Sequence, residues 1–346
     1  MAALLRHRSR TLVTGVLATL TLCIAVAPPA AAQSTLNRVD AAAGWLARQM
    51  VDGERFEVVF DGVAYPDQGL TLDAIFAFAA AKVADTNAAS ATAWLAQPAV
   101  TTGYIGDGTE AYAGATAKLA LGAQVRGLNP AAFGGVDLIA RLHTLMAPTG
   151  RFTDRSAFGD FSNMFSQSFA VLALDRAGGA PPAAVAFLAG ARCPDGGFPL
   201  LFAQATCVSD VDATALAIQA LLAADRPLVA QAAARWLVSV QADDGSFTAN
   251  GVANANSTGL AAQALAAAGR AVPWLEARQY LTSLQQGCTA PTANRGAIAY
   301  TDGGYDPATA TRATAQAVPG LAGSGFATLS AAGSHPVAPT LACPHR

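Results

Sequence analysis

The stretch ARWLVSVQADDGSF (residues 234–247), followed by NSTGLAAQAL (residues 256–265), is the clearest copy of a phrase that runs through the whole chain. The anchor position of the phrase recurs at Trp45, Trp94, Arg141, Phe187, Trp236 and Tyr280. The steps between these anchors are 49, 47, 46, 49 and 44 residues. A repeat of this length is one supersecondary unit that cannot bury its own apolar face, so the units must stack on one another.

Each repeat reads as a pair of helices. Residues 229–241 have apolar side chains at helical spacing, whereas residues 258–268 are almost entirely Ala, Leu and Gln. The first pattern is amphipathic and the second is apolar all round, which predicts an outer helix and a more buried inner helix. The first repeat, with Trp45, Ile75 and Phe76, is as apolar as the middle ones, so it cannot be a polar cap of an open array. The predicted fold is therefore all-α, a closed (α/α)6 toroid of six helical hairpins.

Short polar residues and turns mark the ends of these helices. Side chains that accept the free N–H groups of a first turn are predicted as N-caps of the inner helices, namely Asp67, Asp212, Asn256 and Asp306. Asp-Gly turns and a following aromatic residue join the two halves, as at Asp244, Gly245 and Phe247. These residues are interpreted as structural.

The first 32 residues have the plan of a secretory signal peptide: Arg6, Arg8 and Arg10, an apolar run over 12–27, and small residues before Gln33. The run is too short to span a membrane. Its removal takes away three arginines, so 21 basic residues become 18 against 23 acidic ones, a net charge of −5. The mature chain lacks the basic surface that nucleic acid requires. We expect a secreted or cell-surface protein with a toroid over 33–330 and a tail over 331–346.

Four cysteines remain after the leader, an even number that indicates two disulfides in an exported chain. Of three possible connectivities we favour Cys193 with Cys207, inside the fourth repeat, and Cys288 with Cys343, which would tie the tail back to the sixth repeat. No C-x-x-C spacing is present and the mature histidines are scattered, so no metal site and no cofactor are predicted.

The motif from Gln241 through Gly245 to Phe247, with weaker copies around Gln49 and Gln285, resembles the repeat of the terpenoid cyclase and protein prenyltransferase superfamily. The resemblance covers about residues 38–325 and implies an α/α toroid. One such fold hosts unrelated sites, so it does not decide function. The Asp-x-Cys pair of the zinc prenyltransferases is missing.

Class II cyclases of this superfamily protonate an isoprenoid with an Asp-x-Asp-Asp motif followed by Thr. Residues 209–214, SDVDAT, match at Asp210 and Asp212, with Ala213 in place of the last Asp. The resemblance implies Asp212 as general acid and Asp210 as its neighbour, with aromatic side chains around a carbocation; Phe158, Phe161, Phe165 and Phe169 have the spacing for this. The competing interpretation is capping, because Asp212 occupies the repeat position of Asn256.

The leading hypothesis is a toroid that binds a small apolar ligand or an extracellular protein partner at its rim or lumen, without catalysis. It resembles the helical domain of secreted cobalamin carriers, and a monomer is expected. Candidate ligand-binding residues are Tyr112, Phe158, Phe161, Phe165, Phe202 and Tyr305.

A third hypothesis is an (α/α)6 carbohydrate-active enzyme, which needs two carboxylates across a cleft and aromatic sugar platforms. The available acids are Asp107, Glu110, Asp154, Asp160, Asp210, Asp212 and Asp302, with Tyr104, Tyr112, Tyr300 and Tyr305 as platforms. No spacing selects one pair.

Overall fold

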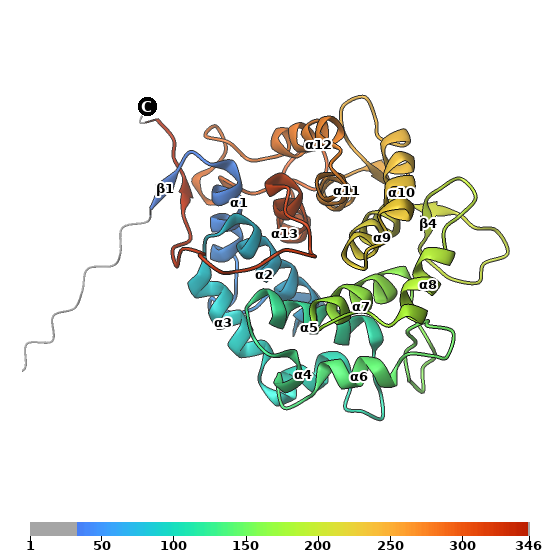
Figure 1. The fold of residues 1–346 in the computed structure, drawn as a ribbon. Helices are drawn as coiled ribbons and strands as arrows, with labels where there is room; N and C mark the ends of the chain where they lie inside the picture. The colour runs from blue at the N-terminus through green and yellow to red at the C-terminus, as the bar shows by residue number, and fades with distance from the viewer. Residues whose placement is uncertain (1–32, 345–346) are drawn as a thin grey trace, which may run out of the picture. The chain divides into compact units, whose positions relative to one another are not determined.

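A computed structural model describes residues 33–344 of the chain, and the predicted signal peptide lies outside the described residues. Helices alternate between an inner ring and an outer ring around one axis (Figure 1). Over residues 33–344, every helix is too short or too polar to cross a membrane. The all-α toroid predicted from the repeat is confirmed.

Six helices form the inner ring: α2 (Gln68–Ala81), α5 (Ala113–Val125), α7 (Met164–Arg176), α9 (Val211–Ala223), α11 (Ala255–Ala267) and α13 (Pro307–Ala322). Each packs against the next, and α13 packs against α2, so the ring closes on itself. Equal positions face one another: Asp73 and Lys118, each the sixth residue of its helix, form an ion pair. Gln219 and Gln263, each the ninth, share a hydrogen bond. The inner helices therefore run parallel, with their N-termini at one rim.

The outer ring consists of α1 (Arg38–Arg48), α3 (Asp85–Leu95), α4 (Pro98–Ile105), α6 (Leu138–Thr144), α8 (Pro182–Gly190), α10 (Pro227–Ser239) and α12 (Ala271–Ser283). The second repeat has two outer helices because Pro98 begins a new helix after a short break. Two 3-10 segments, η1 (Pro130–Ala132) and η2 (Thr292–Asn294), lie in connecting loops. Each outer helix packs against the inner ring.

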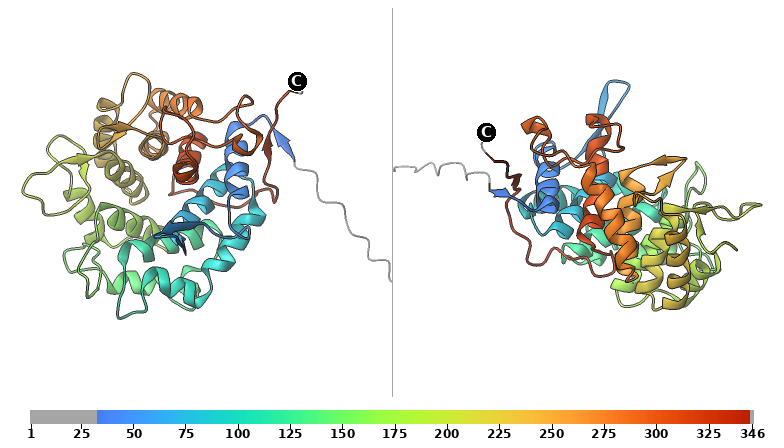
Figure 2. Two further views of the ribbon diagram at one scale, coloured as in Figure 1. Left: turned by 180° about the vertical axis from the view of Figure 1, so that it is seen from behind. Right: turned by 90° about the horizontal axis from the view of Figure 1, so that it is seen from above.

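Short strands lie in several of the loops that precede the inner helices. Three antiparallel hairpins are formed by β2 (Glu57–Phe60) with β3 (Val63–Pro66), β4 (Phe198–Pro199) with β5 (Ser209–Asp210), and β6 (Thr248–Ala249) with β7 (Val252–Ala253). The β2–β3 hairpin projects from the body (Figure 2). A parallel pair joins β1 (Ser34–Thr35) to β8 (Thr340–Leu341), bringing the two ends of the described chain together.

A hydrogen bond between the turn and the inner helix recurs around the ring. The backbone N–H of Phe56 donates to the Thr71 hydroxyl, and four equivalent bonds of 2.8–2.9 Å run from Phe152, Phe198, Phe247 and Ile298 to Gln167, Thr214, Thr258 and Thr314. The donor residues are buried. The bond satisfies a buried backbone N–H, and it fixes the turn against the helix that follows.

Glutamines of the repeat motif join neighbouring hairpins. The Gln241 amide donates to the carbonyl of Gly245 in its own turn and to that of Pro273 in the next outer helix, at 3.1 and 2.9 Å. Gln285 makes the same pair of bonds, with the carbonyls of Gly296 and Arg38, so the sixth hairpin is tied to the first. The motif is structural, as its sequence predicted.

The capping residues of two inner helices differ from the prediction. Asp210, not Asp212, caps α9, and its carboxylate accepts the Ala213 N–H at 2.8 Å. Asn254, not Asn256, caps α11. Capping therefore does not explain Asp212 or Asn256, because each is the second residue of its helix and lies after the cap. Asp67 and Asp306 cap α2 and α13 as predicted.

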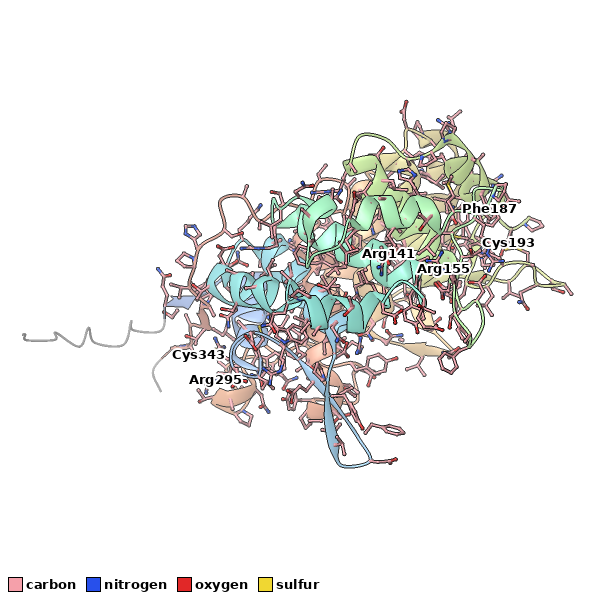
Figure 3. All side chains as sticks on the ribbon, turned by 90° about the horizontal axis from the view of Figure 1, so that it is seen from below. Arg141, Arg155, Phe187, Cys193, Arg295 and Cys343 are labelled. Atoms are coloured by element: carbon pink, nitrogen blue, oxygen red, sulfur yellow. A yellow bond between two sulfur atoms is a disulfide. The ribbon has the colours of Figure 1, made fainter. Side chains whose placement is uncertain are left out.

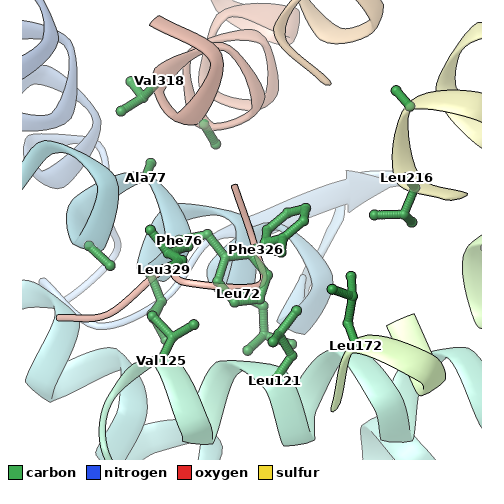
Figure 4. Packing of buried hydrophobic residues seen from close by; sticks show 14 of the residues in the cluster. Leu72, Phe76, Ala77, Leu121, Val125, Leu172, Leu216, Val318, Phe326 and Leu329 are labelled. Carbon is green, nitrogen blue, oxygen red and sulfur yellow. The ribbon is translucent and has the colours of Figure 1, made fainter. Parts of the chain in front are cut away.

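The C-terminal tail closes one end of the ring. After α13 the chain crosses beneath the inner helices, and the Phe326 ring enters the lumen among Leu72, Phe76 and Leu216 (Figure 4). The Phe326 N–H donates to Gln219 at 2.9 Å, and Arg176 donates to the Phe326 carbonyl at 2.9 Å. The tail thus forms the floor of the lumen.

Both predicted disulfides, Cys193–Cys207 and Cys288–Cys343, are confirmed. Cys193 and Cys343 lie on opposite flanks of the molecule (Figure 3). The second bridge joins the tail to the loop after α12, next to the β1–β8 pair. It therefore anchors the segment that carries the floor of the lumen.

Close contact between α11 and α13 predicts the cost of one extra carbon. A Cβ on Gly259 would lie 2.5 Å from the Gln316 carbonyl oxygen. Gly259→Ala should therefore lower the free energy of unfolding by about 1–3 kcal/mol, because rigid backbone must move. Gly103→Ala is the matched control: this exposed glycine in α4 has open space around it, so alanine should be neutral or stabilising by up to about 1 kcal/mol. Urea denaturation measures both, and equal effects would contradict the tight contact.

Candidate functional site

The lumen of the inner ring holds a cavity of about 170 Å³. All six inner helices and Phe326 of the tail contribute to its lining. Phe326 closes one side of the cavity, and a mouth leaves it partly open to solvent. Small-molecule sites are usually concave and mostly apolar, with a few polar groups.

Aromatic rings make up much of the apolar wall. Phe76, Phe165, Phe169 and Phe326 line the cavity. The Phe326 ring centroid lies 5.1 Å from that of Phe76 and 5.7 Å from that of Phe169, both edge to face. These contacts hold the rings in fixed positions, since edge-to-face packing is the favoured geometry of aromatic pairs.

A buried ion pair crosses the wall between α2 and α5. Lys118 Nζ lies 2.6 Å from Asp73 Oδ1 and donates to the Gly69 carbonyl at 3.0 Å. The Gln316 amide donates to Asp73 Oδ2 at 3.2 Å. Both Asp73 oxygens are thus occupied, which a buried carboxylate requires. This pair is neutral overall.

Asp212 and Asn256 also face the cavity, and each has an unsatisfied oxygen. They are the second residues of the neighbouring parallel helices α9 and α11. Asp212 Oδ1 and Asn256 Oδ1 are buried and have no hydrogen-bond partner. Buried polar atoms without a partner are rare and call for an explanation such as a ligand.

Burial raises the pKa of Asp212 to about 6, because the low-polarity lumen disfavours the charged form. The nearby Asp210 carboxylate also raises this pKa, whereas the nearby Ser257 hydroxyl, a hydrogen-bond donor, lowers it. A carboxyl group with such a pKa changes charge close to physiological pH. It can act as an acceptor, an ion-pair partner or a proton donor.

The residues predicted from sequence do not form one site. Asp212 and Phe165 line the lumen together with Phe169. Asp210 is a helix cap, and the Tyr305 ring lies against Trp45 with centroids 6.4 Å apart. These last two therefore lie outside the cavity lining.

The four phenylalanines with helical spacing do not lie on one helix face, because the first two, Phe158 and Phe161, precede the helix. Helix α7 begins at Met164, so Phe158 and Phe161 lie in the preceding loop, where they are 79% and 71% exposed. The loop folds back on itself and is held against α5, because Asp154 accepts the N–H groups of both Phe161 and Ala113. These two rings belong to the rim.

Tyr112 and Phe202 lie in different places again. The Tyr112 hydroxyl donates to Glu110 at 3.3 Å in the loop before α5. Phe202 lies in a separate outer groove, 5.0 Å from Phe187 and 5.2 Å from the Arg151 guanidinium. Figure 3 shows Phe187 near Cys193, and Arg141 and Arg155 nearer the middle of the molecule.

Among residues 33–344 no three side chains of His, Cys, Asp or Glu gather as a metal site.

Sequence reasoning missed Asp73 and Lys118. A signal for them exists, because Asp73 is the one charged residue of α2 and Lys118 is one of two lysines in the sequence. A charge inside an apolar helix needs a buried partner. Phe326 carried no signal, since it follows the last repeat.

The raised pKa of Asp212 has a consequence for stability that the Asp212→Asn variant tests. A folded-state pKa above the unfolded value means that this group stabilises the fold below about pH 4 and loses that contribution as the pH rises through about 6. The loss is at most about 3 kcal/mol. Asparagine does not ionise, so the variant should gain stability relative to the native protein between pH 4 and pH 7.

Urea denaturation of the native protein and of Asp212→Asn, at pH 4 and at pH 7, measures this change in stability. Asp243→Asn removes one exposed carboxylate outside the lumen and controls for the loss of a charge. If Asp212→Asn differs from the native protein by the same free energy at both pH values, the raised pKa is wrong.

No family model matches the chain, and no curated protein matches its sequence. Solved structures do match its fold. A protein from Actinoplanes is 16% identical, with 83% of this chain and 98% of that chain covered, at a TM-score of 0.61. A variant of the type II terpene cyclase MstE from Scytonema, in complex with its substrate geranylgeranyl dihydroxybenzoate, is 15% identical. The match covers 84% of this chain and 97% of that chain, at a TM-score of 0.59.

An unsaturated glucuronyl hydrolase from Bacillus sp. GL1, responsible for the degradation of glycosaminoglycan, is 13% identical over 83% of this chain and 95% of that chain, at a TM-score of 0.54. Identities this low establish shared architecture and not shared chemistry. The chain therefore has an α/α-toroid fold, which it shares with the terpene cyclase MstE and the glucuronyl hydrolase.

Proposed function

We propose that this protein binds a small, largely apolar molecule in its lumen, with the polar group of that molecule at Asp212 and Asn256. The observation that carries the proposal is the unsatisfied Asp212 Oδ1 in an aromatic cavity. A ligand that supplies a hydrogen-bond donor there would remove the cost of a buried unpaired oxygen, about 1–3 kcal/mol. Phe76, Phe165 and Phe326 would enclose its apolar part.

The size of the cavity limits the ligand. An apolar cavity of about 150 Å³ is large enough for benzene. A cavity of about 170 Å³ therefore encloses a group of that size, and a longer molecule must extend through the mouth. Rim residues such as Tyr112 and Tyr305 are candidates to contact the part outside.

A cyclase-like general acid would use the same Asp212. Its raised pKa suits proton donation, and the aromatic wall suits a cation. Against this role, Asp210 is engaged as a helix cap, and the floor at Phe326 leaves little room for an isoprenoid chain. Binding requires neither a second free acid nor a larger lumen, so it is the better account.

The carbohydrate hypothesis has less support. Two rim acids tie neighbouring loops together: Glu110 accepts the Ala157 N–H, and Asp154 accepts the Ala113 N–H. Asp160 is held by Arg151 at 2.8 Å. Carboxylates committed to loop structure are poor general acids or bases, because those hydrogen bonds would break when the group is protonated.

We also propose that the protein is exported. Two disulfides support this, since such bonds persist in oxidising compartments. The basic, apolar and small-residue order of the first 32 residues supplies the signal.

Cleavage near Gln33 is the testable part of the export proposal. The protein recovered from the culture medium of its own source should begin at or within a few residues of Gln33. Intact-mass and N-terminal peptide analysis measure this. Recovery of the chain from the cytoplasm with residues 1–32 attached and its cysteines reduced would contradict export.

Lumen binding is tested by filling the lumen. Ala315 is buried and lines the cavity, so Ala315→Leu would occupy space that a ligand needs. Benzyl alcohol, a probe with a benzene ring and one hydroxyl, should bind the native protein and lose more than about ten-fold in affinity for the variant. Titration followed by NMR chemical shifts measures this.

Ala271→Leu adds the same side chain at the exposed start of α12 and is the control. It should bind the probe like the native protein. Unchanged binding by a folded Ala315→Leu variant would show that the probe binds elsewhere, and the lumen proposal would then be wrong.

A further inference from the structure

We infer that the lumen selects a protonated amine: a primary or secondary ammonium group carried on a small apolar body, with the ammonium at Asp212 and Asn256. The inference rests on the proposed function and names the class of ligand. Three independent features of the lumen lead to it, namely its unsatisfied acceptors, its charge and its aromatic faces.

The first feature is the kind of atom left without a partner. Both buried unpaired atoms that face the lumen, Asp212 Oδ1 and Asn256 Oδ1, are acceptors. An ammonium group offers two or three N–H donors and no acceptor, so it can serve both oxygens at once. A ligand carboxylate or phosphate has only acceptors and would leave both oxygens unsatisfied.

The second feature is the charge of the lining. Three ionisable groups line the cavity, and two of them, Asp73 and Lys118, neutralise each other at 2.6 Å. The third, Asp212, has no basic partner, so its ionised form gives the lumen a net negative charge. Lys118 cannot attract an anion effectively because Asp73 and the Gly69 carbonyl already bind its ammonium. A buried charge requires a partner of opposite sign, and a cationic ligand supplies it.

The third feature is the set of ring faces and edges around the cavity. Phe165 and Phe169 come from α7, next to α9, which carries Asp212. Aromatic rings attract a nearby cation, by about 0.5–2 kcal/mol when water is excluded. Lys118 already uses this attraction, with its Nζ 6.0 Å from the Phe169 centroid. The lumen therefore accommodates a cation better than a neutral polar group of the same size.

The test compares benzylamine with benzyl alcohol, which differ only in the polar group and fit the same volume. The native protein should bind benzylamine at least about ten-fold more tightly at pH 7.5, because its hydrogen bond to Asp212 is charge-assisted. Asp212→Asn should weaken benzylamine binding by at least about ten-fold. The same variant should change benzyl alcohol binding by less than about three-fold, since an amide oxygen still accepts a hydroxyl. Isothermal titration and NMR shifts measure both.

Asp243→Asn is again the control, because it makes the same charge change on the exposed surface after α10. It should leave the preference for the amine intact and so exclude a general attraction to an acidic protein. Equal affinities of the native protein for both probes, or unchanged amine binding by Asp212→Asn, would overturn the amine inference. The proposed lumen function would still stand if benzyl alcohol binds and Ala315→Leu blocks it. Failure of both probes to bind would overturn the proposed function itself.

Discussion

The hydrogen bond from a turn residue to the side chain of an inner helix is the interaction on which this toroid depends. It recurs from Phe56 to Thr71 and from Phe247 to Thr258, at 3.0 and 2.9 Å. The bond ties the turn after an outer helix to the following inner helix in five of the six hairpins, so it sets how those inner helices are rotated about their own axes. With that rotation fixed, the residue two positions after each acceptor, such as Asp73 or Leu216, faces the lumen. The site is therefore a consequence of the joint between helices.

Close packing determines how much room the lumen has. Alanines fill most of the contacts between helices, and Gly259 lets α11 approach the backbone of α13. A ring of six helices packed this closely leaves a narrow space, and the Phe326 ring shortens it. In so small a volume a polar group is either paired or held at a cost. Asp73 and Lys118 are paired within the protein, whereas Asp212 is not.

The fold could be predicted from the sequence because it is encoded six times. The period fixed the number of hairpins, and the cysteine positions gave the two bridges. The site could not be predicted in the same way. Asp210 and Asp212 are two residues apart at a helix start, and sequence patterns locate a helix start only to within a residue or two. Asp73 and Lys118 meet only when neighbouring hairpins stack, and Phe326 reaches the lumen from a segment outside the repeat. Such contacts leave no local pattern.

Comparison of equivalent positions around the ring separates structure from function. The fourth residues of α2, α9 and α11 are all threonine, because each must accept the same turn N–H. The residues two positions before these acceptors differ: Gly69, Phe165, Asp212, Asn256 and, in α13, Arg312. Three of them, Phe165, Asp212 and Asn256, line the cavity, where they supply an aromatic ring and two groups with oxygen acceptors. The acceptor position is more uniform, with Thr in α2, α9, α11 and α13 and Gln167 in α7, because each of these side chains must accept the turn N–H. The chemistry of the lumen therefore lies at the positions where the repeat is broken, with an aromatic side at α7 and a polar side at α9 and α11.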